Sequence, residues 1–266
     1  MTLPRISIVT LSFNQARFLE AAIRSILDQG YANLDYIIVD PGSTDGSRDI
    51  IECYRPQLSA VLLDPDKGPA DGLNKGFAAA TGDILGYINA DDLLLPGALA
   101  AIAAHFQARP ELDAICGNGV MIGADGETLR SMKTSRFNLA DIGHGAMTFV
   151  QQAHWFRRRA FDAAGGFNIA NRTSWDGELL VDMTLAGARF ANVPDQLGAF
   201  RLYGDTITGS GRLAAQMAID IARIRAKALG RPPAASDRLV GPLRVLARRL
   251  ADPTATLEGV RARLQG

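Results

Sequence analysis

The stretch Gly82–Asp92, with the sequence GDILGYINADD, decides the fold of this chain. Its apolar middle, Ile84–Ile88, contains β-branched and aromatic residues and is typical of a buried strand. The strand runs directly into Asn89, Asp91 and Asp92. In open α/β sheets, ligands bind beyond the carboxyl ends of the strands, so we expect these polar residues to lie at a functional site.

Asp91 and Asp92 indicate a divalent cation, because two adjacent carboxylates repel each other and lose hydration when they are clustered. Hard oxygen ligands with few other protein donors favour Mg²⁺ or Mn²⁺ bound together with substrate phosphates. Taken alone, the pair fits a structural role equally well, as a cap for the helix expected after Pro96.

The composition sets the broad class of protein. A chain of 266 residues with 47% hydrophobic residues can bury a real core, as one large domain or as a domain with an appendage. Its net charge of zero provides no overall field that would attract nucleic acid. Cys53 and Cys116 form neither a metal-binding spacing nor a disulfide framework, which fits a reducing compartment. Without a signal-peptide pattern or an apolar run of roughly 20 residues, we expect a soluble, cytoplasmic protein.

Strands and helices alternate through the first part of the chain. The patterns predict strands over Ile6–Thr10, Tyr36–Val39, Ala60–Leu63 and Ile84–Ile88, with helices after Asn14 as N-cap, over Arg48–Tyr54 and over Ala70–Ala80. This alternation predicts a mostly parallel sheet with right-handed crossovers, flanked by helices. The expected strand ends are polar, at Thr10 and Ser12, Asp40, Asp64 and Asp91, and would form one nucleotide cleft.

Neither of the common phosphate-binding glycine motifs is present. The first strand is not followed by Gly-x-Gly-x-x-Gly, and no Walker-type Gly-Lys-Ser/Thr occurs. We therefore expect phosphates to be held mainly through the metal ion.

The pattern changes after the helix predicted over Pro96–Gln107. Ala114–Ile122 and Thr128–Met132 flank an Asp-Gly turn and predict a hairpin. Further along we expect an irregular loop over Phe137–Gly145, an extended stretch over Phe149–Phe156, and helices over Arg158–Ala164 and Leu179–Ala186. Edge strands or extended connections follow over Arg189–Val193 and Gly198–Tyr203. Trp175, just before the second of these helices, fits a platform for a sugar and a core residue equally well.

The C-terminal part is helical in pattern, over Leu213–Leu229, Leu239–Leu250 and Leu257–Leu264. It carries many arginines and few acids. Such helices can contact an anionic membrane surface, and the same pattern fits the solvated face of a helical appendage equally well.

Five blocks between about Ile6 and Thr208 resemble the family 2 glycosyltransferases of GT-A fold. They are Ser7–Gln15 (SIVTLSFNQ), Val39–Ser47 (VDPGSTDGS), Asp66–Gly76 (DKGPADGLNKG), Asn89–Asp92 (NADD) and Ser174–Leu179 (SWDGEL). The third is similar to the family's Gly-x-x-Asp-Ala-x-Asn-x-Gly block, the fourth to its metal-binding Asp-x-Asp region and the fifth to the segment with the catalytic base. Each block alone is weakly specific, and five in the same order are strong.

The resemblance implies a role for each matching residue. Thr10, Ser12, Phe13 and neighbouring Asn14 would contact the base and ribose of a nucleotide, and Asp40 would accept hydrogen bonds from a uracil or thymine base. Lys67 would face the diphosphate, while Asp71, Asn74 and Asn89 would shape the donor pocket. Asp91 would bind Mn²⁺ or Mg²⁺, with Asp92 beside it. Asp176 would be the general base, with Glu178 as its competitor.

The chain departs from the family pattern at three positions. Asn89 stands where the family often has the first Asp, and Pro41 replaces a frequent glycine. Tyr203 stands where many relatives carry a histidine that helps to hold the metal or the phosphates, which puts a histidine role there in doubt.

Together these observations predict a GT-A domain over residues 1–209, with a nucleotide-binding half over 1–95 and an acceptor half over 96–209. Residues 210–266 would be a helical C-terminal extension. We expect an inverting, metal-dependent, hexosyltransferase-like enzyme of cell-envelope polysaccharide biosynthesis, which moves a sugar from a UDP- or dTDP-sugar to a glycan or lipid-linked acceptor. The alternatives are a nucleotidyltransferase-like enzyme and a catalytically silent module that binds nucleotide-sugars. The extension could also place the protein peripherally at the inner face of the membrane.

Overall fold

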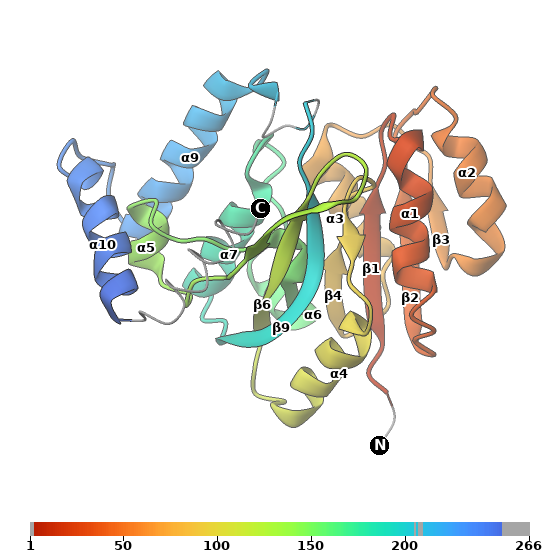
Figure 1. The fold of residues 1–266 in the computed structure, drawn as a ribbon, viewed down its shortest axis with the longest axis horizontal. Coiled ribbons are helices and arrows are strands. Elements are labelled where there is room, and N and C mark those ends of the chain that lie inside the picture. Colours follow the sequence, from red (N-terminus) through yellow and green to blue (C-terminus); the bar gives the residue numbers. More distant parts are fainter. Residues whose placement is uncertain (1–2, 205, 207–209, 252–266) are drawn as a thin grey trace.

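The structure is a computed structural model, which describes residues 3–204, 206 and 210–251. One curled sheet crosses the molecule, with helices on both of its faces (Figure 1). The strand order is β3-β2-β1-β4-β8-β6-β9-β5, and β7 pairs with β6.

The first half of the sheet is parallel, as the sequence predicts. It contains β1 (Ile6–Leu11), β2 (Leu34–Val39), β3 (Ala60–Leu62) and β4 (Ile84–Tyr87). The connecting helices are α1 (Ala16–Leu27), α2 (Ser47–Tyr54), which continues into a short 3-10 turn at Arg55–Gln57, and α3 (Pro69–Ala79). The carboxyl ends of β1, β2 and β4 therefore meet at one edge of the sheet.

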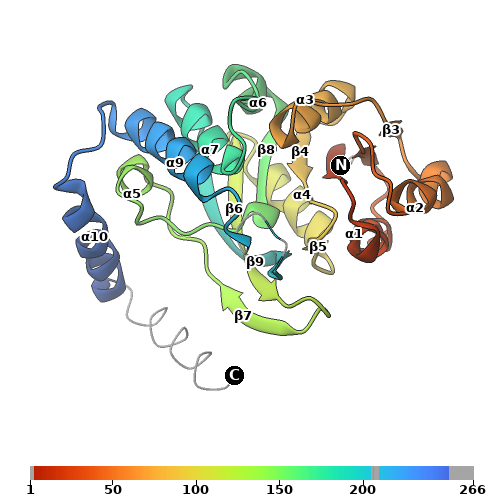
Figure 2. The same cartoon turned by 90° about the horizontal axis from the view of Figure 1, so that it is seen from above.

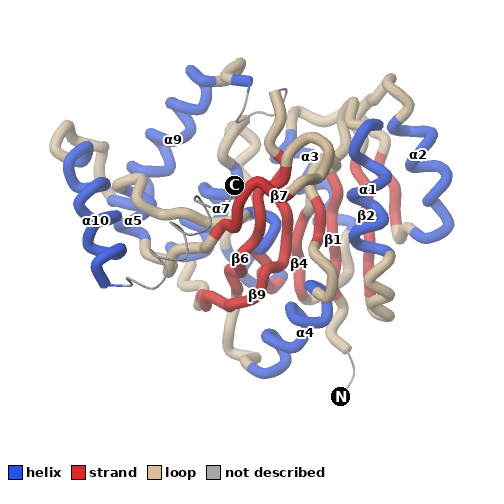
Figure 3. Tube along the Cα trace, viewed as in Figure 1, coloured by secondary structure: helices blue, strands red, loops and turns tan. Residues whose placement is uncertain are grey.

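The second half makes the sheet mixed. It contains β5 (Leu93–Leu94), β6 (Ala114–Ile122), β7 (Thr128–Met132), β8 (His154–Arg157) and β9 (Phe190–Arg201). β8 is antiparallel to β4 and β6, whereas β9 is parallel to β6. β6 and β9 lie side by side in the sheet (Figure 3). The remaining elements are α4 (Ala98–Ala108), α5 (Leu139–Gly143), the 3-10 turn η2 (Gln151–Ala153), α6 (Arg158–Ala163) and α7 (Trp175–Leu185).

Two predictions for this half are wrong. The two expected edge strands are one strand, β9, which lies between β6 and β5 inside the sheet. This strand contains Pro194, which lies near shifts in the register between β6 and β9. The loop expected over residues 137–145 contains α5, which Asn138 caps through its side chain.

Alternating residues of the central strands form two cores, one on each face of the sheet. Ile6 and Ile8 pack with Leu19 of α1 in the first core. Val9, on the opposite face of β1, packs with Phe77 of α3 in the second. Side chains alternate between the two cores because successive residues of a strand point to opposite faces of the sheet. This alternation also fixes the orientation of the loops that follow the strands.

The start of α1 differs from the prediction, because Asn14 is not its N-cap. Asn14 has a left-handed backbone (φ 52°), and its side chain accepts a hydrogen bond from Thr44 N at 2.9 Å. The helix begins at Ala16, whose backbone N–H donates to Asp45 Oδ2 at 2.8 Å. The loop after β2 thus caps α1, and it ties two loops of the sheet edge together.

Two long helices follow the sheet, α9 (Ala214–Leu229) and α10 (Asp237–Ala251). α9 packs against α5 and α7, whereas α10 lies at the edge of the molecule in both views (Figures 1 and 2). Among the described helices, none combines the length and the apolar run of a membrane span. The helix expected over residues 257–264 lies outside the described residues, and the boundary at residues 209/210 stays a prediction.

Candidate active site

A cavity of about 1110 Å³ opens at the carboxyl ends of β1 and β4. Residues from distant parts of the chain line it, among them Ser12 and Phe13 after β1, Lys67 before α3, Asn89 and Asp91 after β4, and Asp176 at the start of α7. Most of the predicted site thus converges on one space.

Asp91 is the carboxylate at the end of the central strand. Its Oδ2 accepts a hydrogen bond from the hydroxyl of Tyr203 at 3.1 Å, and Gln15 Nε2 donates to the same hydroxyl at 3.1 Å. Burial raises the pKa of Asp91 above its usual value, in spite of the Tyr203 hydrogen bond. The pKa of Tyr203 rises to about 12, because of burial and the charge of Asp91. Tyr203 is therefore a neutral donor to Asp91.

Asp92 belongs to the lining of the same cavity, although it is almost fully buried. Its Oδ1 accepts from Arg201 N at 2.9 Å, and its Oδ2 accepts from Gln152 Nε2 at 2.7 Å and Asn89 Nδ2 at 3.1 Å. Burial and the neighbouring charge of Asp91 raise the pKa of Asp92 to about 8. Protein donors thus reach both carboxylate oxygens of Asp92. Its role beside Asp91 at a metal ion stays a prediction.

The donor set around Asp91 fits Mg²⁺ or Mn²⁺. These ions take one or two protein carboxylates and complete their shells with water and substrate phosphate oxygens. Within the described part of the chain, no three His, Cys, Asp or Glu residues form a closed ligand cluster, so an all-protein site of the zinc type has no basis there. Burial raises the pKa of both Asp91 and Asp92, and the charge of Asp91 adds to the shift at Asp92. A bound cation would favour the charged form of both carboxyls.

Asp176 lies in the first turn of α7 and lines the same cavity. Its Oδ1 accepts a hydrogen bond from Gly177 N at 2.8 Å. Burial raises its pKa to about 6, since no cation pairs with it among the described residues. A carboxylate with such a pKa can accept a proton near neutral pH.

Trp175 precedes Asp176 and also lines the cavity, although only 8% of it is exposed. Its indole Nε1 donates to the hydroxyl of Tyr87 at 3.0 Å. Trp175 therefore belongs to both the core and the cavity wall. The sequence left two interpretations open for it, a core residue and a platform for a sugar, and this position is compatible with both.

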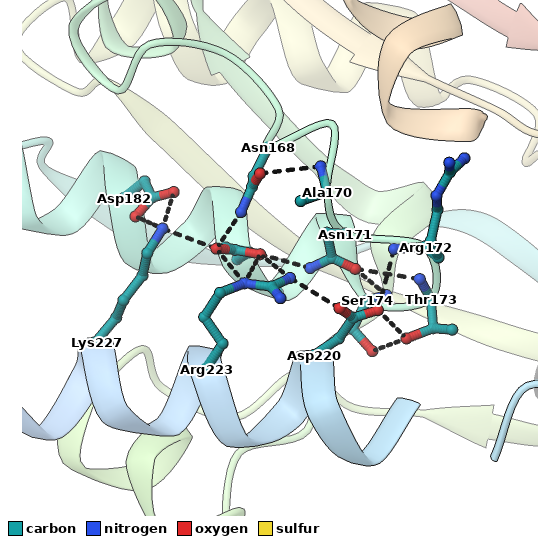
Figure 4. Close-up of polar contacts among 12 residues, drawn as sticks. Asn168, Ala170, Asn171, Arg172, Thr173, Ser174, Asp182, Asp220, Arg223 and Lys227 are labelled. Carbon is teal, nitrogen blue, oxygen red and sulfur yellow. Dashed lines mark hydrogen bonds and ion pairs between the residues drawn. The ribbon is translucent and has the colours of Figure 1, made fainter. Parts of the chain in front are cut away.

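Glu178 is held in a different way, by a network of polar side chains (Figure 4). Arg223 of α9 and Lys227 of α9 approach its carboxylate at 2.9 Å and 2.8 Å, and Asn168 and Asn171 donate to it at 2.9 Å and 2.7 Å. Burial alone would raise the pKa of Glu178, but these four partners outweigh it and lower the pKa to about 2. Glu178 is not among the described residues that line the cavity.

The same network holds the loop before α7. Asp220 of α9 accepts from Arg172 N at 3.0 Å and from Thr173 Oγ1 at 2.9 Å. Arg172 and Thr173 line the cavity. The Arg172 guanidinium also donates a hydrogen bond to the backbone oxygen of Lys67, another lining residue. α9 thus fixes the position of the segment that ends at Asp176.

Comparison with known proteins agrees with this arrangement. Residues 7–172 match the family described as Glycosyl transferase family 2. The chain belongs to that family.

The family 2 glycosyltransferase has relatives in sequence and in structure. It is 30% identical to the PGL/p-HBAD biosynthesis glycosyltransferase of Mycobacterium bovis over 182 residues, which are 66% of this chain and 69% of the relative. It spans between 38% and 69% of the length of the first two relatives that it matches.

Two solved structures share the fold. One is S. aureus TarS 1-349 in complex with UDP-GlcNAc, with a TM-score of 0.69 and 17% identity over 93% of this chain and 73% of that one. The other is the mannosyltransferase PcManGT from Pyrobaculum calidifontis in complex with GDP-Man and Mn²⁺, with a TM-score of 0.66 and 21% identity over 99% and 81% of the two chains. The predicted GT-A fold is confirmed.

Not every residue predicted to bind the nucleotide reaches the cavity of this glycosyltransferase. Ser12, Phe13, Lys67 and Asn89 line it. Thr10, Asn14, Asp40, Asp71 and Asn74 are not among the described residues that do so.

These residues form hydrogen bonds with other protein groups around the site. The Thr10 hydroxyl pairs with the Tyr36 hydroxyl at 2.9 Å, and Asp71 accepts from Lys67 N at 2.9 Å. Asn74 donates to Phe167 O and accepts from Phe167 N, so it joins α3 to the segment before α7. The predicted contacts with a nucleotide stay a prediction for all of them.

Asp40 combines a buried position with unused hydrogen-bonding capacity. Its Oδ1 accepts from Ser43 N at 2.8 Å and Arg48 Nε at 3.1 Å, whereas its Oδ2 has no hydrogen-bond partner among the described residues. The next residue, Pro41, lines the cavity. The buried Ser12 hydroxyl, at the end of the adjacent strand, also has no partner within the described chain.

The sequence did not reveal two residues that organise the site, Arg201 and Gln152. Arg201 is 4% exposed; its Nε donates to Asp91 O at 2.7 Å, and its Nη1 donates to Gly123 O at 2.9 Å. Gln152 donates to Asp92 from η2. Both are strongly polar side chains within otherwise apolar extended stretches. This pattern could have indicated their role, because a polar group is buried only when it has hydrogen-bond partners.

Proposed function

We propose that this enzyme is an inverting, metal-dependent glycosyltransferase that moves a hexosyl group from a nucleoside diphosphate-sugar to a hydroxyl group. The observation that carries the proposal is the convergence of Asp91 and Asp176 on one cavity, although 85 positions separate them in the chain. One carboxylate can serve the leaving group, and the other can serve the nucleophile.

Asp91 would hold the cation, and the Tyr203 hydroxyl would fix the orientation of its carboxylate. Mg²⁺ or Mn²⁺ bound there would supply Lewis-acid stabilisation of the departing nucleoside diphosphate. Lys67 lines the cavity and adds a positive charge on the phosphate side. The Mn²⁺ in the PcManGT structure supports a metal in this fold.

Asp176 would take the proton of the acceptor hydroxyl as this oxygen attacks the anomeric carbon. General-base catalysis of this kind is worth about 10²–10⁴-fold in rate. The geometry favours Asp176 over Glu178, because only Asp176 lines the cavity and Glu178 is bound by two cations. Direct displacement by the acceptor oxygen inverts the anomeric centre, and no enzyme-bound sugar intermediate is needed.

A UDP- or dTDP-sugar is the favoured donor. Asp40 Oδ2 is a buried acceptor without a partner in the described chain, and the imide N–H of uracil or thymine is a matching donor. Pro41, beside Asp40, lines the cavity. The UDP-GlcNAc complex of TarS supports a uridine donor, and the GDP-Man complex of PcManGT makes a guanosine donor the necessary comparison.

The acceptor would be a glycan or a lipid-linked molecule of cell-envelope polysaccharide biosynthesis. The mycobacterial relative is named for PGL/p-HBAD biosynthesis, which supports a biosynthetic role.

The decisive experiment measures nucleoside diphosphate release from a panel of UDP-, dTDP- and GDP-sugars with and without MnCl₂. The wild type should release diphosphate only with the metal, and Asp91→Asn should lose at least about 10²-fold. Equal release by both proteins would refute the assignment of Asp91. In parallel, UDP or dTDP should raise the melting temperature in the presence of Mn²⁺ more than GDP does.

We extend the proposal to peripheral membrane contact through α10. Its outer side exposes four leucines, each more than half accessible: Leu239, Leu243, Leu246 and Leu250. The spacing of three or four residues places them on one stripe of the helix. The sequence of α10 has four arginines and one acid, which suits an anionic lipid surface.

Vesicle sedimentation tests this contact. Binding to vesicles with anionic phosphatidylglycerol should fall at least about tenfold for Leu243→Glu, because a charge replaces buried apolar area. Leu185→Glu is the control, since Leu185 is an equally exposed leucine on α7. An equal loss in both variants, or no binding by the wild type, would remove membrane contact from the proposal.

A further inference from the structure

The cavity has a second wall that differs in chemistry from the carboxylate side. Every residue that β6, β7 and β9 contribute to the cavity is apolar: Met121, Met132 and Phe200. Phe149 and Val150, from the segment before η2, extend the same wall. We call these five residues the apolar wall.

The strand register shows why the three side chains share a face. Met121 of β6 is paired with Phe200 of β9, so both side chains point to the same side of the sheet. Met132 of β7 is paired with Gly119, two residues before Met121, and two residues along a strand return to the same side. Three adjacent strands therefore present one continuous apolar surface.

Gly119 allows the wall to close. A Cβ atom at this position would come within 2.8 Å of Val150 Cγ1 and within 2.4 Å of Gly198 O. The missing side chain lets Val150 pack directly against the strand, and Val150 is almost fully buried. The apolar wall is thus a packed surface of the fold.

Such a wall is poorly suited to a bare sugar chain. Sugar hydroxyl groups placed against methionine, valine and phenylalanine side chains would lose water without gaining hydrogen-bond partners, which costs free energy for each group. An aromatic ring or an alkyl chain would instead gain about 25 cal/mol per Å² of buried apolar area. Methionine side chains also adapt readily to apolar ligands of different shape.

We propose that the apolar wall is the binding subsite for an apolar aglycone, so that the acceptor is an amphipathic molecule with its reactive hydroxyl close to an aromatic ring or alkyl chain. This inference rests on the proposed function, since it assigns the acceptor side of the same site. Trp175 and Asp176 line the same cavity, where the polar part of the acceptor would bind.

The test uses the full chain with UDP and MnCl₂ and compares three probes by isothermal titration calorimetry. Methyl, phenyl and octyl β-D-glucosides share one sugar and differ only in the aglycone; octyl glucoside is kept below its critical micelle concentration. Octyl or phenyl glucoside should bind at least about tenfold more tightly than methyl glucoside, because burial of two methylene groups already corresponds to this factor. The stronger of the two identifies the alkyl or the aromatic type of aglycone.

Two variants locate the binding. Met132→Gln and Phe149→Ser replace partly exposed members of the wall and should each reduce the aglycone preference at least threefold, while affinity for methyl glucoside stays the same. Leu185→Ser removes an exposed leucine outside the cavity and should change nothing. Melting curves establish that each variant is folded before it is titrated.

The outcomes separate this inference from the proposed function. If the three glucosides bind equally, or none binds, the aglycone subsite is refuted, even when diphosphate release still depends on Asp91. If the aglycone preference is intact but diphosphate release does not depend on Asp91, the catalytic assignment fails and the apolar subsite stands. A preference that both wall variants leave unchanged also refutes the subsite.

Discussion

Asp176 and Glu178 lie two residues apart in the first turn of α7, yet the fold treats them in opposite ways. Asp176 lines the cavity, and burial raises its pKa to about 6. Glu178 points to α9, where Arg223, Lys227 and two asparagines lower its pKa to about 2. Residues at positions i and i+2 of a helix do not share a face, so neighbours from different elements determine the chemistry of each carboxyl.

The largest expected effect is on the rate of transfer in Asp176→Asn. The amide cannot accept the proton of the acceptor hydroxyl, so we expect kcat to fall about 10²–10⁴-fold. Its Oδ1 can still accept from Gly177 N, so the melting temperature should stay close to that of the wild type. Steady-state kinetics with the best donor measure this. A loss smaller than tenfold would show that another group acts as the base.

Glu178→Gln should mainly change stability. It leaves Arg223 and Lys227 next to a neutral side chain in a buried position, which should lower the free energy of unfolding by about 3 kcal/mol. Urea denaturation measures this change. We expect kcat of the folded variant to fall much less than in Asp176→Asn, and the reverse order would exchange the two roles.

The pH dependence of the rate gives a third comparison. A general base acts in its deprotonated form, so kcat/KM should fall about tenfold for each pH unit below about 6 and level off above it. Glu178→Gln should keep this inflection. An inflection near pH 4 in the wild type would mean that burial does not raise the pKa of the base.

The two carboxyls also contribute to stability with opposite signs. The pKa of Asp176 is raised in the folded state, so its contribution to stability falls as pH rises from about 4 to about 6. The pKa of Glu178 is lowered, so it contributes stability above about pH 4 that is lost as pH falls toward about 2. Urea titrations of both variants at several pH values should show these opposite trends relative to the wild type.

The smallest effect is expected for Lys227→Met. Lys227 is about one third exposed, and Arg223 remains to pair with Glu178. Because solvent screens a partly exposed pair, the loss in unfolding free energy should be about 1 kcal/mol or less. The same urea titrations measure it, and a loss as large as that of Glu178→Gln would make Lys227 the main partner of Glu178.

The sequence predicted the fold of residues 1–95 well, because local patterns determine it. β1 to β4 and α1 to α3 each lie within a few residues of their expected positions, since their strands are apolar runs that end in polar turns. The predicted hairpin of β6 and β7 is also confirmed, as the Asp-Gly turn specifies it locally.

The remaining errors come from partners that are distant in sequence. The choice between Asp176 and Glu178 depends on Arg223 and Lys227, which are 45 and 49 residues from Glu178 along the chain. Arg201 and Gln152, which donate hydrogen bonds to Asp92, are 109 and 60 residues from it along the chain. Asn14 had the composition of a helix cap, but Asp45 from the next loop caps α1 instead. No local pattern contains this information.

The ties between α9 and α7 have a consequence for any shortened form of the protein. A chain that ends at residue 209 would keep Glu178 and Asp182 but lose both cations that neutralise them, together with the Asp220 side chain that anchors Arg172 and Thr173. Truncation there would leave uncompensated negative charge on α7. The minimal active fragment should therefore extend at least through Leu229, where α9 ends.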